Sequence, residues 1–117
     1  MTETISTFEA ERRLRVLAKS GFGAGLPRRR NDRWILLFSA RAALPAGERW
    51  NEKTLNELLA AWIARLGGRL ELDHVTLRRA LIDEGFLERV PDGSRYWTST
   101  GYERYVRFVA SGSDAQA

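Results

Sequence analysis

The chain has 117 residues, of which 44% are hydrophobic, and it contains no cysteine. That length fits one domain with a core that needs no covalent staple, and the absence of cysteine excludes disulfides and thiolate metal sites. The formal net charge is +4, and the basic residues comprise 17 arginines and two lysines. Arginine favours bidentate phosphate contacts, so a polyanion is one partner that this composition suits. A base-composition bias of the genome would give the same arginine content.

The N-terminal stretch MTETISTFEAERR has no basic region followed by an apolar run, so it is not predicted to be a secretory signal. No apolar stretch in the sequence approaches the roughly 20 residues that a membrane-spanning helix needs. We therefore expect a cytoplasmic protein that does not contact a membrane.

Residues 6–20 are predicted to form an N-terminal helix, because Ser6 and Glu9 have the spacing of a capping box. Two pairs of opposite charge stand four residues apart within it, Glu9–Arg13 and Glu11–Arg15. Such pairs predict that these arginines lie on a solvated face. The helix has two apolar edges, formed by Leu14, Leu17 and Ala18 and by Ile5, Phe8 and Val16. Two edges need two partners, and a second subunit is a candidate for one of them.

The segment 21–31 is predicted to be a loop. Its glycines follow a helix rather than a strand and match neither dinucleotide nor P-loop spacing, so we expect no nucleotide site there. Asp32 is expected to cap a second helix over residues 33–44, which is apolar nearly all round and belongs in the middle of a core. Its run Trp-Ile-Leu-Leu-Phe also fits a buried strand, but the Ala-Arg-Ala-Ala-Leu continuation favours a helix.

The segment 48–50 is long enough for a short strand, and Asn51 is expected to cap a third helix over residues 52–66. This helix has the clearest apolar stripe in the chain, at i, i+3, i+4 and i+7 spacing. Its members are Leu55, Leu58, Leu59, Trp62, Ile63 and Leu66.

Asp73 is expected to cap a fourth helix over residues 74–84, which leads directly into strands over 86–90 and 95–98. The turn between the strands, Pro91-Asp92-Gly93-Ser94, suits a type I turn closed by a left-handed residue. A short helix that runs into a tight hairpin is the arrangement in which a winged helix places its reading helix beside its wing.

A further helix is predicted over residues 100–110, because Tyr102, Tyr105, Val106 and Val109 form an apolar stripe. Residues 111–117 are expected to be a disordered polar tail. The predicted fold is α+β and mostly helical. It has a winged-helix-like core over 26–98, in the order helix–strand–helix–helix–hairpin, with an extra N-terminal and an extra C-terminal helix. Residues 1–110 are predicted to form a single domain.

The core resembles a bacterial family, the one catalogued as domain of unknown function 2087. The resemblance rests on Leu26-Pro27-Arg28-Arg29-Arg30 and on Gly47-Glu48-Arg49-Trp50 before the helix Glu52-Lys53-x-Leu55-Asn56-Glu57. It rests above all on Thr76-Leu77-Arg78-Arg79-x-Leu81-x-Asp83-x-Gly85-x-Leu87-x-Arg89 with Asp92-Gly93-Ser94-x-Tyr96. It implies a small helical domain that ends in a hairpin. Such domains occur in prokaryotic proteins that sometimes also carry a transcription-regulator helix-turn-helix, and the resemblance implies no established activity.

If this motif reads DNA, the fourth helix should lie in the major groove and the hairpin should touch phosphates. Helical periodicity places Arg78 toward the core, with its guanidinium paired to a carboxylate, and places Thr76, Arg79 and Asp83 on the opposite face. The predicted DNA contacts are Arg28, Arg29, Arg30, Thr76, Arg79, Arg89 and Arg95.

The charge distribution weakens this interpretation for the motif itself. Residues 74–98 contain four arginines and four acidic residues, whereas residues 28–50 contain six arginines against Asp32 and Glu48. Because phosphate affinity grows with the number of charges neutralised, any polyanion contact should centre on Arg28–Arg30. The rival interpretation is a protein-interaction, dimerisation or ligand-sensing module that keeps the fold without binding DNA.

No catalytic, cofactor or metal site is predicted, so we expect a protein that is not an enzyme. His74 is the only histidine, and its neighbour Asp73 does not face it at a helix start. No serine has a candidate base other than His74. The predicted function is a bacterial transcription-regulator-type winged-helix module that binds double-stranded DNA, as a homodimer through its N- and C-terminal helices.

Overall fold

The computed structural model describes residues 2–21, 25–67 and 71–110. It has four α-helices, which are α1 Thr7–Ser20, α2 Arg30–Ala42, α3 Glu52–Leu66 and α4 His74–Asp83. Its strands are β1 Glu3–Ser6, β2 Leu87–Arg89, β3 Tyr96–Thr98 and β4 Val106–Val109, and a 3₁₀ turn, η1, spans Gly101–Arg104. The prediction of an α+β, mostly helical fold is confirmed. Within these ranges no helix has the length and apolarity that crossing a membrane requires.

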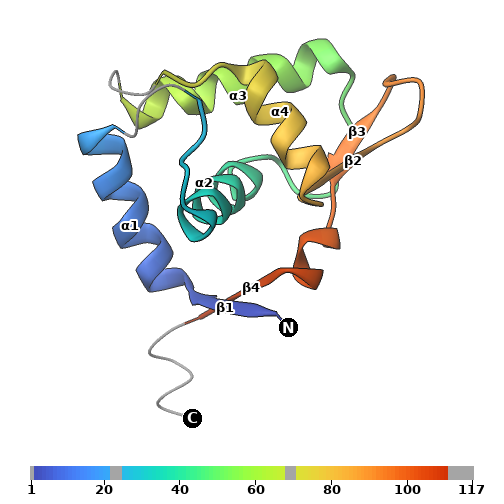
Figure 1. Ribbon diagram of the computed structural model, residues 1–117. Helices are drawn as coiled ribbons and strands as arrows, with labels where there is room; N and C mark the ends of the chain where they lie inside the picture. Colours follow the sequence, from blue (N-terminus) through green and yellow to red (C-terminus); the bar gives the residue numbers. More distant parts are fainter. Residues whose placement is uncertain (1, 22–24, 68–70, 111–117) are drawn as a thin grey trace.

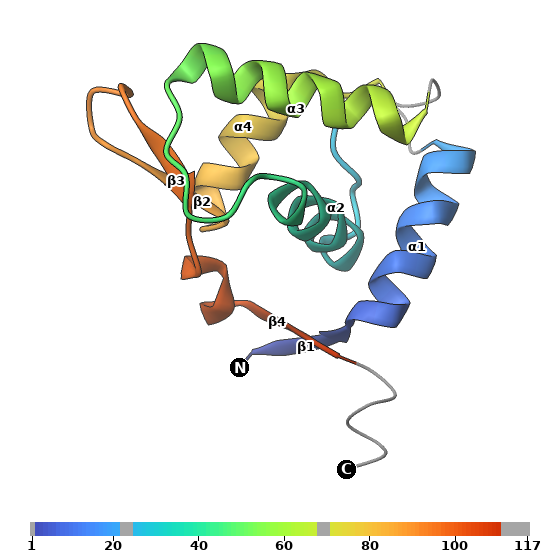
Figure 2. The same cartoon turned by 180° about the vertical axis from the view of Figure 1, so that it is seen from behind.

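Helix α2 lies in the middle of the fold, where both views show it end-on with the other elements around it (Figures 1 and 2). Leu36 and Leu37 have no exposed surface, as the apolar composition of this segment predicts. The expected cap was wrong. The helix begins at Arg30, and Asp32 lies inside its first turn, where the carboxylate is buried against α1 and hydrogen-bonds to Arg13.

Helices α3 and α4 pack against each other, and capping side chains fix where both begin. Asn51 accepts a hydrogen bond from the Thr54 N–H at 2.8 Å, and Asp73 accepts one from the Thr76 N–H at 2.8 Å. These bonds satisfy N–H groups that a helix start otherwise leaves without partners. The predicted bounds of α3 are confirmed, and α4 ends one residue earlier than expected.

Strands β2 and β3 form the predicted antiparallel hairpin, in which Leu87 pairs with Thr98 and Arg89 with Tyr96. The predicted strand over 48–50 is reduced to a single bridge, in which Trp50 and Tyr96 exchange backbone hydrogen bonds of 2.9 and 2.8 Å. The order along the chain is therefore helix, bridge, helix, helix and hairpin.

The predicted C-terminal helix is wrong. The segment after the hairpin forms η1 and then β4, which pairs in parallel with β1 from Glu3↔Val106 to Ser6↔Val109. Spacing of apolar residues fits a helix here, but the partner that selects a strand lies at the other end of the chain. Phe108 stacks on Phe38 of α2 with ring centroids 3.9 Å apart, which fixes β4 to the core.

The N-terminal strand β1 was not predicted, although the helix after it was. Ser6 accepts a hydrogen bond from the Glu9 N–H at 3.0 Å, which confirms it as the cap of α1. The predicted tail over 111–117 and residues 22–24 of the predicted loop lie outside the described residues.

Candidate nucleic-acid interface

The start of α4 is built around the Asp73 carboxylate. Its second oxygen accepts a hydrogen bond from the Thr76 hydroxyl at 3.1 Å, in addition to the capping bond. These hydrogen bonds from Thr76 lower the pKa of Asp73 below its ordinary value. Because the hydroxyl proton of Thr76 is committed to the cap, contact with a phosphate would require that this bond be broken.

Arg78 lies on the buried side of α4, as predicted, where it contacts α3, and its side chain is only 13% exposed. The guanidinium donates a 2.5 Å hydrogen bond to the amide oxygen of Asn56 and lies 4.0 Å from the Glu52 carboxylate. Glu52 in turn accepts a 3.1 Å hydrogen bond from the Tyr96 hydroxyl. The expected carboxylate partner of Arg78 is thus Glu52, and the neutral amide of Asn56 is a closer acceptor. Through these contacts α3 ties α4 to the hairpin.

A pocket of about 280 Å³ opens where α4, α3 and the hairpin meet. We call it the arginine pocket, and its lining is Glu52, Arg78, Arg79, Ile82, Asp83, Arg89 and Tyr96. Arg79 and Arg89 are exposed, and neither has an ion-pair partner in the part of the chain that the structure describes. Three guanidinium groups against two carboxylates give this pocket a positive balance.

The two arginines that flank the hairpin turn differ in position, since Arg89 lines the arginine pocket and Arg95 does not. The Gly93 N–H donates to the Val90 carbonyl at 2.9 Å, and Gly93 has φ +76°, the left-handed conformation that the turn requires. The Arg89 guanidinium lies close to Gly93 and faces the arginine pocket. Arg95 donates instead to the carbonyl of its neighbour Ser94 at 2.8 Å and does not line the pocket.

The predicted basic run Arg28–Arg30 does not line the arginine pocket either. Arg30 forms a 3.1 Å ion pair with Glu3 and stacks over the Trp34 ring at 4.8 Å. Arg28 and Arg29 are exposed at the entry to α2. Of the seven predicted contacts, the structure brings together only Arg79 and Arg89.

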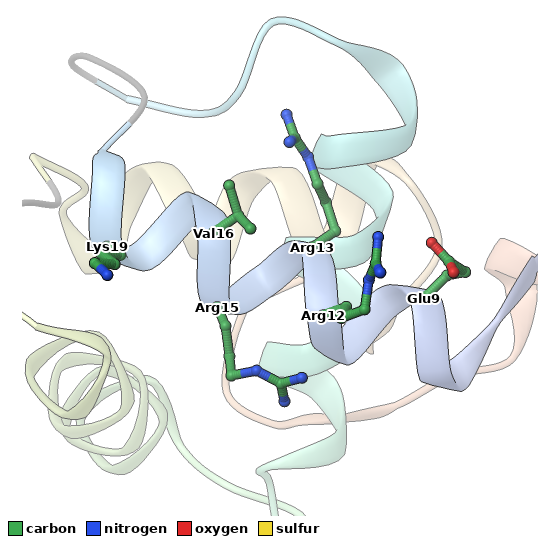
Figure 3. A pocket seen from close by; sticks show the side chains of 6 residues that line it. All are labelled: Glu9, Arg12, Arg13, Arg15, Val16 and Lys19. Atoms are coloured by element: carbon green, nitrogen blue, oxygen red, sulfur yellow. The ribbon is translucent and has the colours of Figure 1, made fainter.

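A second basic surface lies on α1, on the opposite side of the molecule from the hairpin (Figure 1). A hollow of about 400 Å³ beside this helix is lined by Glu9, Arg12, Arg13, Arg15, Val16 and Lys19 (Figure 3). The expected Glu9–Arg13 and Glu11–Arg15 pairs do not form within the described ranges.

Arg13 instead makes two hydrogen bonds with Asp32, of 2.8 and 3.0 Å, and points away from Arg15. These bonds lower the pKa of Asp32 and raise that of Arg13. Arg13 pairs with Asp32 rather than with Glu9 because a buried carboxylate gains more from a guanidinium than an exposed one does.

Sequence reasoning assigned no role in a binding site to three residues at the arginine pocket, Glu52 and Asn56 of α3 and Tyr96 of β3. Glu52, Asn56 and Tyr96 reach the pocket or its wall through contacts 22 to 44 positions apart in the chain. No local pattern signals such contacts. The motifs that carry the family resemblance did contain Glu52, Asn56, Arg78, Arg79, Arg89 and Tyr96, but they do not show that these residues meet.

The model of one bacterial family, described as an uncharacterized protein conserved in bacteria (DUF2087), matches residues 24–98 of this chain. The matched segment contains α2, α3, α4 and the hairpin, and therefore every residue of the arginine pocket. No curated protein and no solved structure matches the chain. The chain belongs to the DUF2087 family of bacterial domains of unknown function.

Proposed function

We propose that this domain binds double-stranded DNA without catalysing a reaction, as a regulatory module of winged-helix type. In this proposal α4 is the reading helix, the β2–β3 hairpin is the wing, and the Trp50–Tyr96 bridge stands for the first strand. The order helix, bridge, helix, helix and hairpin supports it. The module would approach DNA with the side on which α4 meets the hairpin.

The observation that carries this proposal is the arginine pocket. Arg79 from α4 and Arg89 from the hairpin converge on this pocket, and neither has an ion-pair partner among the described residues. Asn56 holds a third guanidinium, that of Arg78, beside them. A planar guanidinium presents two parallel donors to a phosphate, so converging arginines form a site for a backbone phosphate. A phosphate at the junction of helix and wing would fix the register of α4 on the duplex.

The same geometry limits how much sequence α4 can read. Thr76 is committed to its cap and Arg78 faces α3, which leaves Arg79 as the long exposed donor in the middle of the helix. Asp83, at the end of the same helix, would oppose the phosphate charge. We therefore expect binding that depends on backbone phosphates, with a strong dependence on salt and a weak dependence on sequence.

The test is fluorescence anisotropy with a labelled random-sequence duplex across a salt series. The variants Arg79→Gln and Arg89→Gln should each weaken binding by about tenfold and reduce the slope of log affinity against log salt by about one. Arg107→Gln, an exposed arginine on β4 outside the pocket, is the matched control and should bind as the parent does. Absence of binding at low salt, or loss of affinity equal in the control, would overturn the proposal.

The double variant Arg28→Gln/Arg29→Gln decides whether the loop before α2 also contacts DNA. We expect it to weaken binding, because both guanidinium groups are exposed and carry much of the charge excess. An affinity and salt slope equal to the parent's would confine the contact to the arginine pocket.

The rival proposal is an interaction or sensing module that does not bind DNA. It is favoured by the exposed carboxylate of Asp83 at the end of α4 and by exposed apolar side chains elsewhere. Phe8 is 56% exposed, and Val16, Tyr105 and Val109 are 49%, 43% and 38% exposed. Such side chains support contacts with a protein or a small molecule.

A further inference from the structure

A second cleft, of about 530 Å³, shares Asp83 with the arginine pocket. It forms where the starts of β1 and α2 meet the end of α4 and the turn η1. We call it the charged cleft. Its volume falls within the range of small-molecule sites, which is about 300–1,000 Å³.

One wall of the charged cleft is held rigid by Glu84. Its carboxylate accepts a 2.6 Å hydrogen bond from Arg33 Nε and a 2.9 Å hydrogen bond from the indole Nε1 of Trp34. The side chain of Glu84 is only 21% exposed. Two partners on one carboxylate fix the Trp34 ring, and Arg30 covers that ring while paired to Glu3.

These contacts neutralise four of the six charges that line the charged cleft. The remaining two are Asp83 and Arg104, which carry opposite signs and are both exposed. No ion pair joins them to each other or to another residue in the described ranges. Arg104 donates through Nε to the Gly101 carbonyl at 3.1 Å, which orients the guanidinium. Its terminal nitrogens form no hydrogen bond with the residues that the structure describes.

An aromatic surface stands beside these two charges. Tyr105 is 43% exposed, lines the same cleft, and lies under the Arg104 guanidinium at 5.8 Å. An exposed ring next to fixed charges can contact the apolar part of a ligand. The charged cleft thus offers one cation, one anion and one aromatic face.

We propose that the charged cleft binds a small zwitterion of the free α-amino-acid class. The ligand carboxylate pairs with Arg104, its ammonium group pairs with Asp83, and its side chain lies against Tyr105. A simple anion paired with Arg104 would leave Asp83 without a counter-charge in this cleft, and a simple cation paired with Asp83 would leave Arg104 without one. Only a ligand that carries both charges pairs with both Asp83 and Arg104. A ligand with a single charge pairs with one of these residues and lies near the other, whose charge has the same sign as its own.

Amino-acid binding at the charged cleft goes beyond the proposed DNA binding and does not require it. The test therefore uses the full chain without DNA. Uniformly ¹⁵N-labelled protein is titrated with pooled and then single proteinogenic amino acids, and the Trp34 indole N–H and the amides of Asp83, Arg104 and Tyr105 are followed by NMR. We expect saturable shifts at these positions with at least one amino acid.

Two sets of comparisons test the charge assignment. The N-acetyl derivative of the best ligand keeps only the carboxylate, and its carboxamide keeps only the ammonium group, so each should bind at least about tenfold more weakly. Arg104→Gln and Asp83→Asn should each cost about tenfold in affinity for the free amino acid. Arg107→Gln on the neighbouring strand should change nothing.

Several results would overturn the assignment. They are the absence of a saturable shift with any amino acid, equal binding of either one-charge derivative, and unchanged affinity in both cleft variants. The derivatives test the charge requirement on the parent protein, so the outcome does not depend on how a variant folds. DNA binding can fail in its own assay without affecting this one.

Discussion

The backbones of Gly85 and Tyr102 are in direct contact. The Tyr102 N–H donates to the Gly85 carbonyl at 2.9 Å, and a Cβ placed on Gly85 would lie 2.7 Å from the Tyr102 nitrogen. Next to this contact, the rings of Phe86 and Tyr102 stack with centroids 4.4 Å apart. The end of α4 is therefore fixed to η1, and through η1 to β4.

Replacement of Gly85 by alanine should lower the free energy of unfolding by about 2 kcal/mol or more, since its φ of +82° is strained for other residues and the new methyl group overlaps Tyr102. The control is Gly47→Ala, where φ is +75° but nothing lies within 4 Å of a Cβ. Its free energy of unfolding should fall only by the cost of a positive φ in a residue other than glycine, about 1 kcal/mol. Urea denaturation measures both, and equal losses would contradict the close contact.

The Arg13–Asp32 pair predicts a dependence of stability on pH. Hydrogen bonds from Arg13 lower the folded-state pKa of Asp32 below its unfolded value of 3.8. The contribution of the carboxylate is therefore complete well above pH 3.8 and is lost as the pH falls through the folded pKa. Asp32→Asn should destabilise the protein more at pH 7 than at pH 3. An equal loss of stability at both pH values would show that the ion pair is not the cause of the loss. Glu57→Gln on the exposed face of α3 serves as the control.

Asp83 lines both the arginine pocket and the charged cleft, which links the two proposals. Removal of its charge in Asp83→Asn should strengthen DNA binding by about twofold to fivefold at low salt, because a carboxylate near the phosphate site is lost. In the parent protein, an amino acid whose ammonium group pairs with Asp83 should likewise strengthen DNA binding. Anisotropy with and without the amino acid measures both effects, and weaker DNA binding in Asp83→Asn would contradict them.

The predicted homodimer stays a prediction, and its C-terminal helix does not exist. An α1 contact would place Phe8 and Val16 against a second copy, but Arg12, Arg15 and Lys19 lie beside them without ion-pair partners in the described ranges. Association through α1 should therefore increase with salt, which screens like charges, whereas DNA binding should decrease. Light scattering at low and high salt measures it. A monomer under both conditions would contradict the dimer, and Phe8→Ser should shift any dimer toward monomer.

Sequence reasoning succeeded where the signals were local. The apolar stripe of α3 and the cap at Asn51 predicted its bounds, and Asp73 and the Pro91–Ser94 turn predicted α4 and the hairpin. It failed for the last segment, in which Tyr102, Tyr105, Val106 and Val109 have helical spacing. There the tertiary partners decided, since Tyr102 stacks on Phe86 and β4 pairs with a strand at the start of the chain.

The candidate site was predictable only in part. Periodicity placed Arg78 toward the core and Arg79 on the exposed face, and both orientations are confirmed. Arg89 of the hairpin meets Arg79 because of the way the hairpin folds back on α4. The spacing of residues in the sequence does not determine this arrangement. Charge counting pointed instead to Arg28–Arg30, because a net charge does not reveal which arginines are already paired, as Arg30 is with Glu3.

The pairing of β1 with β4 joins segments separated by almost the whole length of the chain. Closing so large a loop costs more conformational entropy than closing the shorter loops that join α2, α3, α4 and the hairpin. This pair of strands should therefore form late in folding and open first under native conditions. The amide protons of β1 and β4 should exchange with solvent earlier than those of α2. The two strands would then pair only after the helical core has assembled, and they would separate without unfolding it.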